Sequence, residues 1–540
     1  MEAVLRDRSR FNIAALPELR AVRRGTGRLL RGLRFAAIVG CAGAVIPPAL
    51  ATSPQGADFP GALVPSLESY IAKGMKTYDA PGVAIGIVAG DKLVYSKGFG
   101  VRSKSGGAPV DPGTVFQIGS TTKAFLAATI AIMVDRGKLH WDDRVVDLAP
   151  DFQLQDPWVT REFRVFDLLA QRSGLPAEVN DGLGMLGYPE ADLIRSLRYV
   201  APVSSFRSTF SYTNITHLQA GRIVAQAGGA RDWNDVLQKD LLDPLAMKET
   251  SYTAAAIEAA PDHAMGYRWT PKGSVEVPFT QIFPYDYYGA GDINSTIDDM
   301  SRWVRLQLGT GSFEGHRLVS EANLEVTRLP RIAMAARASY ASGWVVQETP
   351  NGEIVWHNGG TPNFGAYVGL LPEKNIGVIV LTNEENIGLP DAIGRWTLDR
   401  ILANPEVDYV AIKFKSVRDN YAAAGKLFNR PANPRPAPPI DNLTGAYVNP
   451  AFGKVSVNRD GEASIMTFET TGAAVKLEPW DGNVLTATYI RTGRFAVMAD
   501  SLGPLPLAFV QLQMGQPGKQ DLLRLTFPDD QSYDFVRKTE

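Results

Sequence analysis

The sequence predicts an α+β fold: an antiparallel sheet flanked by helices with a helical subdomain, followed by a small all-β barrel domain. Helical and strand patterns alternate up to about residue 430, with strand patterns at both ends of that region. A proline-rich stretch then interrupts the chain, and short runs of alternating apolar and polar residues follow it. We therefore expect a first domain at residues 52–430, a linker at 431–440 and a β domain at 441–540.

The first domain contains patterns for each element of a helix-covered sheet. Apolar residues spaced as one helix face predict a helix over residues 63–78, and residues 82–100 are typical of two strands joined by a Gly-Asp turn. Ser295 stands three residues before Asp298, which indicates a capping box at the start of a helix. The remaining patterns are strands within residues 353–360 and 365–383 and a final helix around 390–403.

The linker and the β domain follow from composition and alternation. Five prolines between residues 430 and 440 favour an extended, semi-rigid spacer. Beyond it, eight short alternating runs with polar turns predict a small all-β barrel or sandwich. The eight runs are GKVSVN, SIMTFE, AVKLEP, VLTATYI, FAVMAD, AFVQLQM, LLRLTF and YDFVRK.

Composition excludes several classes of function. A formal charge of −2 without a basic stripe argues against nucleic acid as a partner, because phosphate binding needs clustered Lys and Arg. A single Cys excludes a disulfide framework and a thiolate metal cluster. The five His lie far apart in the chain, so we expect no metal and no cofactor.

Residues 1–51 have the pattern of a secretory signal peptide. Six Arg between Arg20 and Arg34 precede an apolar run that ends in the small-residue pattern Ala-Leu-Ala at residues 49–51. This run is about 17 residues long and contains two prolines, so it is too short and too interrupted for a stable membrane span. We predict an exported protein, periplasmic or extracellular, with a lipid anchor at Cys41 as the less favoured alternative.

Ser120 and Lys123 are the first candidate catalytic residues. They stand three apart at the start of a helix that is apolar nearly all round, so they face the same way and the Lys has little access to water. Burial lowers the pKa of a Lys, which can then take the proton of a Ser nucleophile. The alternative is a helix cap followed by a Lys whose stem lies along apolar surface.

Tyr212 and Asn214 flank Thr213 just before a second predicted helix. A Tyr near a buried ammonium can be drawn toward phenolate and share the proton transfer, and an Asn amide can donate to a substrate carbonyl or hold the Lys. The alternative is a Tyr that packs under a helix cap.

The stretch from His357 to Gly360 ends one predicted strand and precedes another. A strand edge there can lie along a substrate, and Gly359 allows a close backbone approach. The N–H groups of Ser120 and Gly360 would then form an oxyanion hole. The alternative is a hairpin turn with a surface His.

In this order the three stretches resemble the serine beta-lactamase and penicillin-binding-protein superfamily, in particular its class C branch of D-aminopeptidases, amidases and esterases. Ser120 and Lys123 match the SxxK motif, Tyr212 to Asn214 match a YxN element, and His357 to Gly359 replace the KTG motif. The resemblance extends over residues 60–410, and the C-terminal region looks like the lipocalin-like domain often appended to these hydrolases. Gln171 and Arg172 stand where a His-Thr pair is frequent, and Asp292 where Gly is frequent.

The resemblance implies an acyl-enzyme mechanism. Ser120 attacks a carbonyl, Lys123 or Tyr212 takes its proton, and Asn214, His357 and Gly359 bind the substrate. A neutral His357 would hold a carboxylate weakly, so beta-lactam turnover is the less favoured activity. We expect a serine peptidase or amidase acting on short linear, D-residue or non-ribosomal peptides.

Two kinds of alternative remain. The first is a carboxylesterase with the same catalytic residues. The second is a beta-lactamase, or a penicillin-binding or sensor protein without turnover, in which either Ser120 stays acylated or the β domain is the active part. In each of these alternatives the partner is a small molecule or a short peptide.

Overall fold

The structure is a computed structural model that describes residues 59–461, 463–515, 520–528 and 531–538. The chain from Asp58 onward forms one compact unit. The predicted signal peptide and Cys41 lie outside the described residues, so both remain predictions. Among the described residues, no helix is both long enough and apolar enough to cross a membrane.

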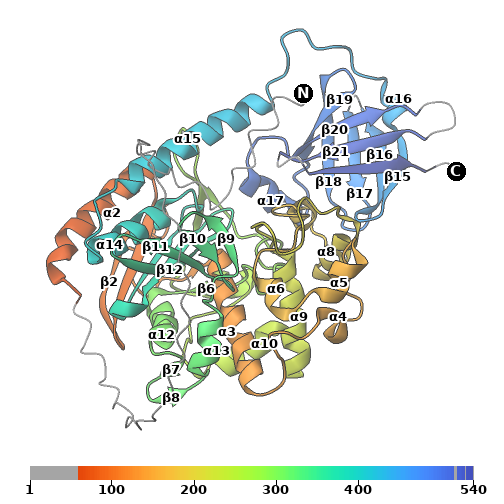
Figure 1. The fold of residues 1–540 in the computed structure, drawn as a ribbon. Helices are drawn as coiled ribbons and strands as arrows, with labels where there is room; N and C mark the ends of the chain where they lie inside the picture. Colours follow the sequence, from red (N-terminus) through yellow and green to blue (C-terminus); the bar gives the residue numbers. More distant parts are fainter. Residues whose placement is uncertain (1–58, 462, 516–519, 529–530, 539–540) are drawn as a thin grey trace, which may run out of the picture. The chain divides into compact units, whose positions relative to one another are not determined.

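The first domain is built on an eight-stranded sheet in which all neighbouring strands are antiparallel, as predicted (Figure 1). The strand order is β2-β1-β14-β13-β12-β11-β10-β9, so strands from both ends of the domain meet in the sheet: Val83 of β1 pairs with Thr382 of β14. The strands are β1 (Gly82–Ala89), β2 (Lys92–Gly100), β9 (Ile332–Ala335), β10 (Ala338–Tyr340), β11 (Val345–Thr349), β12 (Gly352–Gly360), β13 (Gly365–Leu371) and β14 (Ile376–Thr382).

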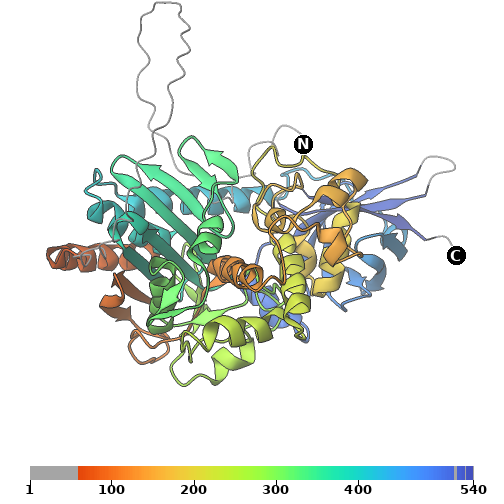
Figure 2. The same ribbon diagram turned by 60° about the horizontal axis from the view of Figure 1, so that its bottom comes forward.

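Helices cover both faces of this sheet (Figures 1 and 2). On one face, α14 (Leu389–Ile401) packs on β13 and β14 and contacts α2 (Val64–Tyr78). On the other face, α12 (Ile297–Leu308) packs on β1 and β14. Because side chains alternate along a strand, coverage on both faces requires continuous apolar runs. All seven residues of β14 are accordingly buried.

A set of helices beside the sheet forms the helical subdomain. Its centre is α3 (Thr122–Asp135), in which every residue from Thr122 to Met133 is buried, in contact with α9 (Ile215–Gly228). The other helices between β2 and β9 are α4 (Val145–Leu148), α5 (Pro157–Glu162), α6 (Val165–Leu169), α7 (Asp181–Met185), α8 (Glu190–Ser196), α10 (Trp233–Leu237), α11 (Ala254–Ala259) and α13 (Glu321–Val326). Short two-stranded pairs join β3 (Phe116–Gln117) to β6 (Asn294–Ser295), β4 (Gly266–Arg268) to β5 (Val275–Val277), and β7 (Ser312–Phe313) to β8 (His316–Arg317).

The C-terminal region is a closed eight-stranded antiparallel barrel, which confirms the predicted architecture. Inward residues alternate with outward ones, as in β17 and β20, where every second residue is buried. The strands are β15 (Gly445–Asn449), β16 (Gly453–Asp460), β17 (Ala463–Phe468), β18 (Ala474–Asp481), β19 (Val484–Tyr489), β20 (Ala508–Gln513), β21 (Leu522–Thr526) and β22 (Ser532–Arg537).

Four details predicted from the sequence were wrong or incomplete. FAVMAD lies in helix α17 (Phe495–Leu502), because Phe495 and Met498 are buried three residues apart, a helical spacing. The short strand β15, with Gly and Asn at its ends, and helix α15 (Tyr409–Leu427), in which Val410 is the one buried residue, were not predicted. The cap of α12 is Thr296, whose hydroxyl accepts from the Asp299 N–H, since Ser295 belongs to β6.

One aromatic contact joins the buried helix α3 to the sheet-covering helix α12. Phe125 and Trp303 are both fully buried, and their rings stack with centroids 4.0 Å apart. Trp303→Ala should therefore lower the free energy of unfolding by about 3–5 kcal/mol, measured by denaturant unfolding. Trp158→Ala is the matched control, because Trp158 is 54% exposed, and should cost less than about 1 kcal/mol. Equal losses in the two variants would contradict a stabilising role for the buried ring pair.

Candidate active site

Ser120 lies in a tight turn, Gly119–Thr121, between β3 and α3. Gly119 has φ +50°, a left-handed conformation that favours glycine, and a Cβ there would lie 2.6 Å from the Gly360 N atom. The turn therefore brings the backbone at Ser120 directly against the end of β12. Helix α3 begins at Thr122, just after this turn, and Ser120 and Lys123 face each other.

Lys123 is fully buried and has three hydrogen-bond partners around its Nζ atom. Nζ donates to Ser120 Oγ at 3.1 Å, to Asn214 Oδ1 at 2.8 Å and to the Ala290 carbonyl at 2.7 Å. All three acceptors are neutral, so none of them forms an ion pair with the ammonium. This is the geometry that a Ser nucleophile with a Lys base requires.

Burial lowers the pKa of Lys123 to about 7. The negative charges of Asp181 and Asp292 act in the opposite direction and raise it, but they do not outweigh the loss of water. A large fraction of Lys123 is consequently neutral near pH 7, and a neutral amine can accept the Ser120 proton.

Tyr212 presents its ring to the same lysine. The ring centroid lies 4.9 Å from Lys123 Nζ, and the side chain is buried. Burial and the neighbouring Tyr340 raise the pKa of Tyr212 well above its usual value, although its interaction with the Ser120 hydroxyl acts to lower it. Burial therefore acts against the phenolate form of Tyr212. Its part in proton transfer remains a prediction.

Asn214 is oriented by a residue that the sequence did not single out. Its Oδ1 accepts from Lys123, and its Nδ2 donates to Asp181 Oδ2 at 2.7 Å. Burial raises the pKa of Asp181 to about 8, with Glu178 adding to this effect and Asn214 and Lys123 opposing it. Asp181 stands 33 residues before Asn214, so no local pattern could have indicated the contact.

Asp292 supports a second hydrogen-bond partner of Lys123, the Ala290 carbonyl. Its two carboxylate oxygens accept from the Gly289 N–H at 2.9 Å and from the Trp233 indole at 3.1 Å. These bonds hold the turn whose Ala290 carbonyl accepts from Lys123. Asp292 is fully buried, and burial raises its pKa to about 7. The sequence marks Asp292 as a departure from the family pattern but does not indicate this role.

The second departure, Gln171 with Arg172, supports the segment that carries Tyr212. Gln171 Oε1 accepts from the Thr213 N–H at 2.6 Å, and the Gln171 carbonyl accepts from the Ser211 N–H at 2.9 Å. Arg172 Nε donates to Asp167 Oδ1 at 3.0 Å. These bonds tie two separate segments of backbone together beside the nucleophile.

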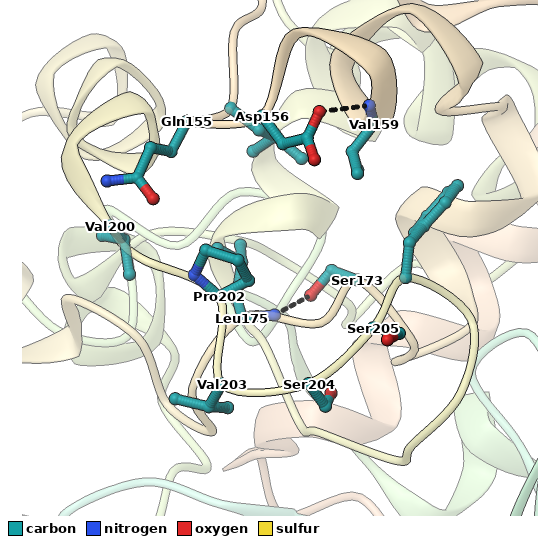
Figure 3. A pocket seen from close by; sticks show the side chains of 12 residues that line it. Gln155, Asp156, Val159, Ser173, Leu175, Val200, Pro202, Val203, Ser204 and Ser205 are labelled. Atoms are coloured by element: carbon teal, nitrogen blue, oxygen red, sulfur yellow. Dashed lines mark hydrogen bonds between the residues drawn. The ribbon is translucent and has the colours of Figure 1, made fainter.

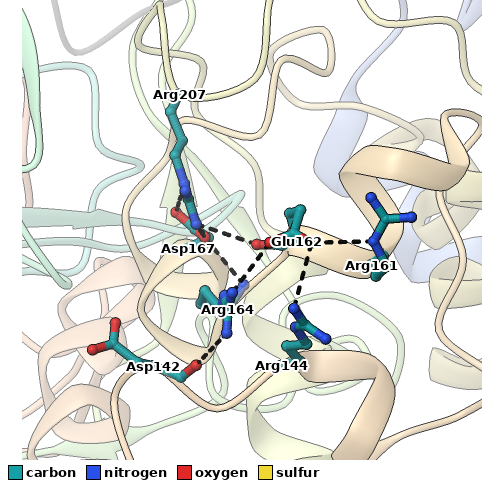
Figure 4. A network of polar contacts seen from close by, with 7 residues as sticks. All are labelled: Asp142, Arg144, Arg161, Glu162, Arg164, Asp167 and Arg207. Atoms are coloured by element: carbon teal, nitrogen blue, oxygen red, sulfur yellow. Dashed lines mark hydrogen bonds and ion pairs between the residues drawn. The ribbon is translucent and has the colours of Figure 1, made fainter.

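Asp167 is the centre of a wider network of charged groups (Figure 4). Its buried carboxylate also accepts from Arg207, with the shortest contact at 2.5 Å, and from the Arg164 N–H at 3.1 Å. Glu162 accepts in turn from Arg161 and Arg164, each at 3.1 Å. The network fixes Arg207, which begins the segment that leads to Tyr212.

His357 is almost completely buried, and the protein uses both of its ring nitrogens. Nδ1 lies 2.5 Å from the Asn358 carbonyl, so it carries the proton, and Nε2 accepts from the Tyr340 hydroxyl at 3.0 Å. Burial, and then the charge of Lys123, lowers the pKa of His357 to about 3. The ring is neutral, and this arrangement leaves neither nitrogen for a substrate. Its predicted role in substrate binding remains a prediction.

The end of β12 is an open edge. Residues 357–360 pair with β13 on one side, whereas the pairing with β11 extends only as far as Trp356. A Cβ on Gly359 would lie 1.9 Å from the Ile118 carbonyl oxygen and 3.1 Å from Ser120 N. Only glycine allows this approach, which places the Ser120 and Gly360 N–H groups at one junction. Their use as an oxyanion hole remains a prediction.

A separate pocket of about 390 Å³ lies beyond the segment 171–175 (Figure 3). It is lined by three groups of residues, and none of the predicted site residues is among them: Leu154 to Asp156 with Val159, Ser173 with Leu175, and Val200 with Pro202 to Phe206. We assign no catalytic part to this pocket. Among the described residues there is no cluster of three or more His, Cys, Asp or Glu that could hold a metal ion.

The fold and the clustered Ser, Lys and Tyr define a serine hydrolase with a beta-lactamase-like catalytic domain. A family model described as Beta-lactamase matches residues 67–403, more than half of the sequence, and the chain belongs to this family.

Individual relatives agree with this assignment. Unguisins hydrolase ungD' of Aspergillus campestris (strain IBT 28561) is 28% identical over an alignment of 413 residues that covers 72% of this chain and 76% of that protein. The octameric penicillin-binding protein homologue from Pyrococcus abyssi is 21% identical, with a TM-score of 0.58 over 88% of this chain and 100% of that chain. A class C beta lactamase from Rhodobacter sphaeroides is 22% identical, with a TM-score of 0.53 over 63% of this chain and 99% of that chain. The two structures show likeness of fold alone.

The close approach at Gly359 can be tested by adding one methyl group. In Gly359→Ala the new Cβ meets the Ile118 carbonyl, so β12 and the nucleophile turn must move apart. We expect kcat/KM to fall by about 100-fold. Gly425→Ala is the matched control, since a Cβ there has no atom within 4 Å, and should leave kcat/KM unchanged. Full activity in Gly359→Ala would contradict the close junction between β12 and the nucleophile turn.

The lowered pKa of Lys123 predicts a pH dependence with a definite sign. The base must be neutral, and its neutral fraction rises as pH passes through about 7. The kcat/KM should therefore rise with pH on the acid side and level off once Lys123 is neutral, and Asp181 and Asp292, with pKa values of about 8 and about 7, titrate in the same range. His357 should add no inflection between pH 5 and pH 9, because its pKa is about 3. A profile that is flat, or that rises only near pH 10, would refute Lys123 as the base.

Proposed function

We propose that the protein is a serine peptidase or amidase that cleaves an amide bond of short linear peptides through an acyl-enzyme on Ser120. The observation that carries the proposal is the buried Lys123, with a pKa of about 7 and its Nζ 3.1 Å from Ser120 Oγ. A Lys at a wet helix end would keep its proton and could not serve as a base.

In the acylation step, Lys123 accepts the proton of Ser120 Oγ as this oxygen bonds to the substrate carbonyl carbon. The negative charge that develops on the carbonyl oxygen is stabilised by the N–H groups of Ser120 and Gly360. The amide C–N bond then breaks, and the leaving amine takes a proton from Lys123, either directly or through Tyr212, which gives its phenol proton to the amine and regains one from Lys123. This leaves an ester between Ser120 and the acyl group.

In the deacylation step, water attacks the ester carbonyl and gives a proton to Lys123. The bond to Ser120 Oγ breaks, and Oγ takes a proton back, which releases the acid and restores the resting site. An amine is a poor leaving group unless it is protonated, so a proton donor beside the nucleophile favours amide substrates. Tyr212, whose ring centroid lies 4.9 Å from Lys123 Nζ, can relay such a proton from Lys123 to the amine.

The open edge of β12 supports an extended peptide as the substrate, and two further observations argue against the alternative functions. The backbone of β12 at residues 357–360 has no strand on one side and can pair with a peptide backbone. The neutral His357 offers no positive charge for a substrate carboxylate at this position, which argues against beta-lactam turnover. The relative from Aspergillus campestris is named a hydrolase, which is consistent with turnover rather than permanent acylation.

The nucleophile is tested by intact-mass measurement with a fluorophosphonate. The wild type should gain one phosphonyl adduct, located at Ser120 by peptide mapping. Ser120→Ala should gain none and should lose at least about 1,000-fold in kcat/KM. Ser416→Ala, which changes an exposed Ser on α15, is the control and should react like the wild type. Adduct formation in Ser120→Ala would overturn the mechanism.

The substrate class is decided by a panel of short linear peptides, D- and L-aminoacyl anilides, p-nitrophenyl esters and a chromogenic cephalosporin. The proposal expects turnover of peptides or anilides and none of the cephalosporin. Turnover of the esters alone would instead establish a carboxylesterase. An adduct that persists without turnover of any compound would indicate a binding or sensor protein.

A further inference from the structure

From the contacts of the C-terminal barrel we infer that it positions the active site: the β21–β22 end holds residues 177–182 so that Asp181 orients the Asn214 amide toward Lys123. The inference rests on the proposed function in that Lys123 is taken to be the base for Ser120. It gives the barrel a part in catalysis that does not require contact with substrate. Gln531 and Asp181 are its positioning residues.

Residues 177–182 contact the active site directly. The Glu178 N–H donates to the Tyr212 carbonyl at 2.6 Å, and Asp181 Oδ2 accepts from Asn214 Nδ2 at 2.7 Å. Both elements of the YxN motif are therefore held by this one segment. Asp181 Oδ1 is buried and has no hydrogen-bond partner among the described residues, so Oδ2 is the oxygen through which Asp181 holds Asn214.

The same segment contacts the barrel through three residues at the ends of β21 and β22. Gln531 Oε1 accepts from the Asn180 N–H at 2.8 Å, and its Nε2 donates to the Glu178 carbonyl at 3.1 Å. The Tyr533 hydroxyl donates to Asn180 Oδ1 at 2.5 Å. The Phe527 ring packs against Gly182, where a Cβ would lie 2.6 Å from the ring. Barrel residues thus contact the chain on both sides of Asp181, by hydrogen bonds before it and by ring packing after it.

Backbone conformation shows why the segment needs support. Glu178 and Asn180 have φ of 53° and 59°. This is a left-handed backbone conformation that residues other than glycine adopt uncommonly. Such residues persist where surrounding contacts hold them in place. Gln531 bonds to the carbonyl of the first and to the N–H of the second. The barrel therefore stabilises the turn that delivers Asp181.

The orientation of the Asn214 amide is what the segment controls. An amide has an acceptor at one end and a donor at the other, and Lys123 needs the acceptor as its neighbour. The Asp181 carboxylate takes the donor end, so the amide oxygen is left to face Lys123. Without Asp181 in place, the amide can turn its NH₂ group toward Lys123 and displace Nζ from Ser120.

The test compares single variants in the full chain, with saturation labelling by a fluorophosphonate as the readout. Gln531→Ala and Asp181→Asn should each lower the maximal rate of labelling by roughly 10- to 100-fold. The half-saturating probe concentration should stay within about twofold, because the probe contacts neither residue. A barrel that covers the cleft or binds substrate would instead change the half-saturating concentration. That result would overturn the inference.

Controls separate positioning from a loss of folding. Gln513→Ala removes another Gln from the barrel, one whose side chain donates to Gln511 on the same strand, and should label at the wild-type rate. Thermal unfolding of each variant checks the fold. If Gln531→Ala does not fold, Tyr533→Phe replaces it, since it removes only a hydroxyl, and should lower the maximal rate in the same way.

A double variant tests whether the barrel acts through Asp181. Gln531→Ala should have little further effect in the Asp181→Asn background, because both changes release the same amide. If the losses in labelling rate of the two single variants multiply in the double variant, or if a folded Gln531→Ala labels at the wild-type rate, the inference is refuted. Either result leaves the proposed function intact. Absence of labelling in the wild type would instead contradict the proposed function itself.

Discussion

The site depends on an amine that the fold deprives of water without providing a neighbouring carboxylate. Lys123 is fully buried, and the three oxygens that accept from its Nζ among the described residues are all neutral. Two carboxylates lie nearby, but each is separated from the lysine by a neutral group: the Asn214 amide stands before Asp181, and the Ala290 turn stands before Asp292. Direct ion pairs would hold the ammonium in its charged form. Their placement one group further away leaves burial as the dominant effect, and the pKa falls to about 7.

The sheet topology explains why the nucleophile meets a strand end that can hold a substrate. Because β11 pairs with β12 only as far as Trp356, the last four residues of β12 are open on the side of the Ser120 turn. Gly119 and Gly359 then let the two backbones come closer than any side chain would allow.

The sequence was sufficient where the interacting residues are close in the chain or repeat with a regular period. Ser120 and Lys123 are one helical turn apart, and the alternation in the last hundred residues indicated the barrel. FAVMAD was misassigned because a six-residue apolar run does not distinguish helix from strand. Asp181 could not be found, because its contact with Asn214 depends on a left-handed turn that barrel residues hold from about 350 positions away.

In the third motif a neutral His357 stands in place of a cation, and this helps to keep the pKa of Lys123 at about 7. The charge of Lys123 is one cause of the low pKa of His357, and coupling between two like charges is reciprocal. A permanent cation at this position would therefore lower the pKa of Lys123 further and weaken it as a base. Burial keeps His357 neutral, and its bonds to Tyr340 and Asn358 fix the ring without adding charge. Lys123 can then remain a base of moderate strength in a site that is otherwise poor in water.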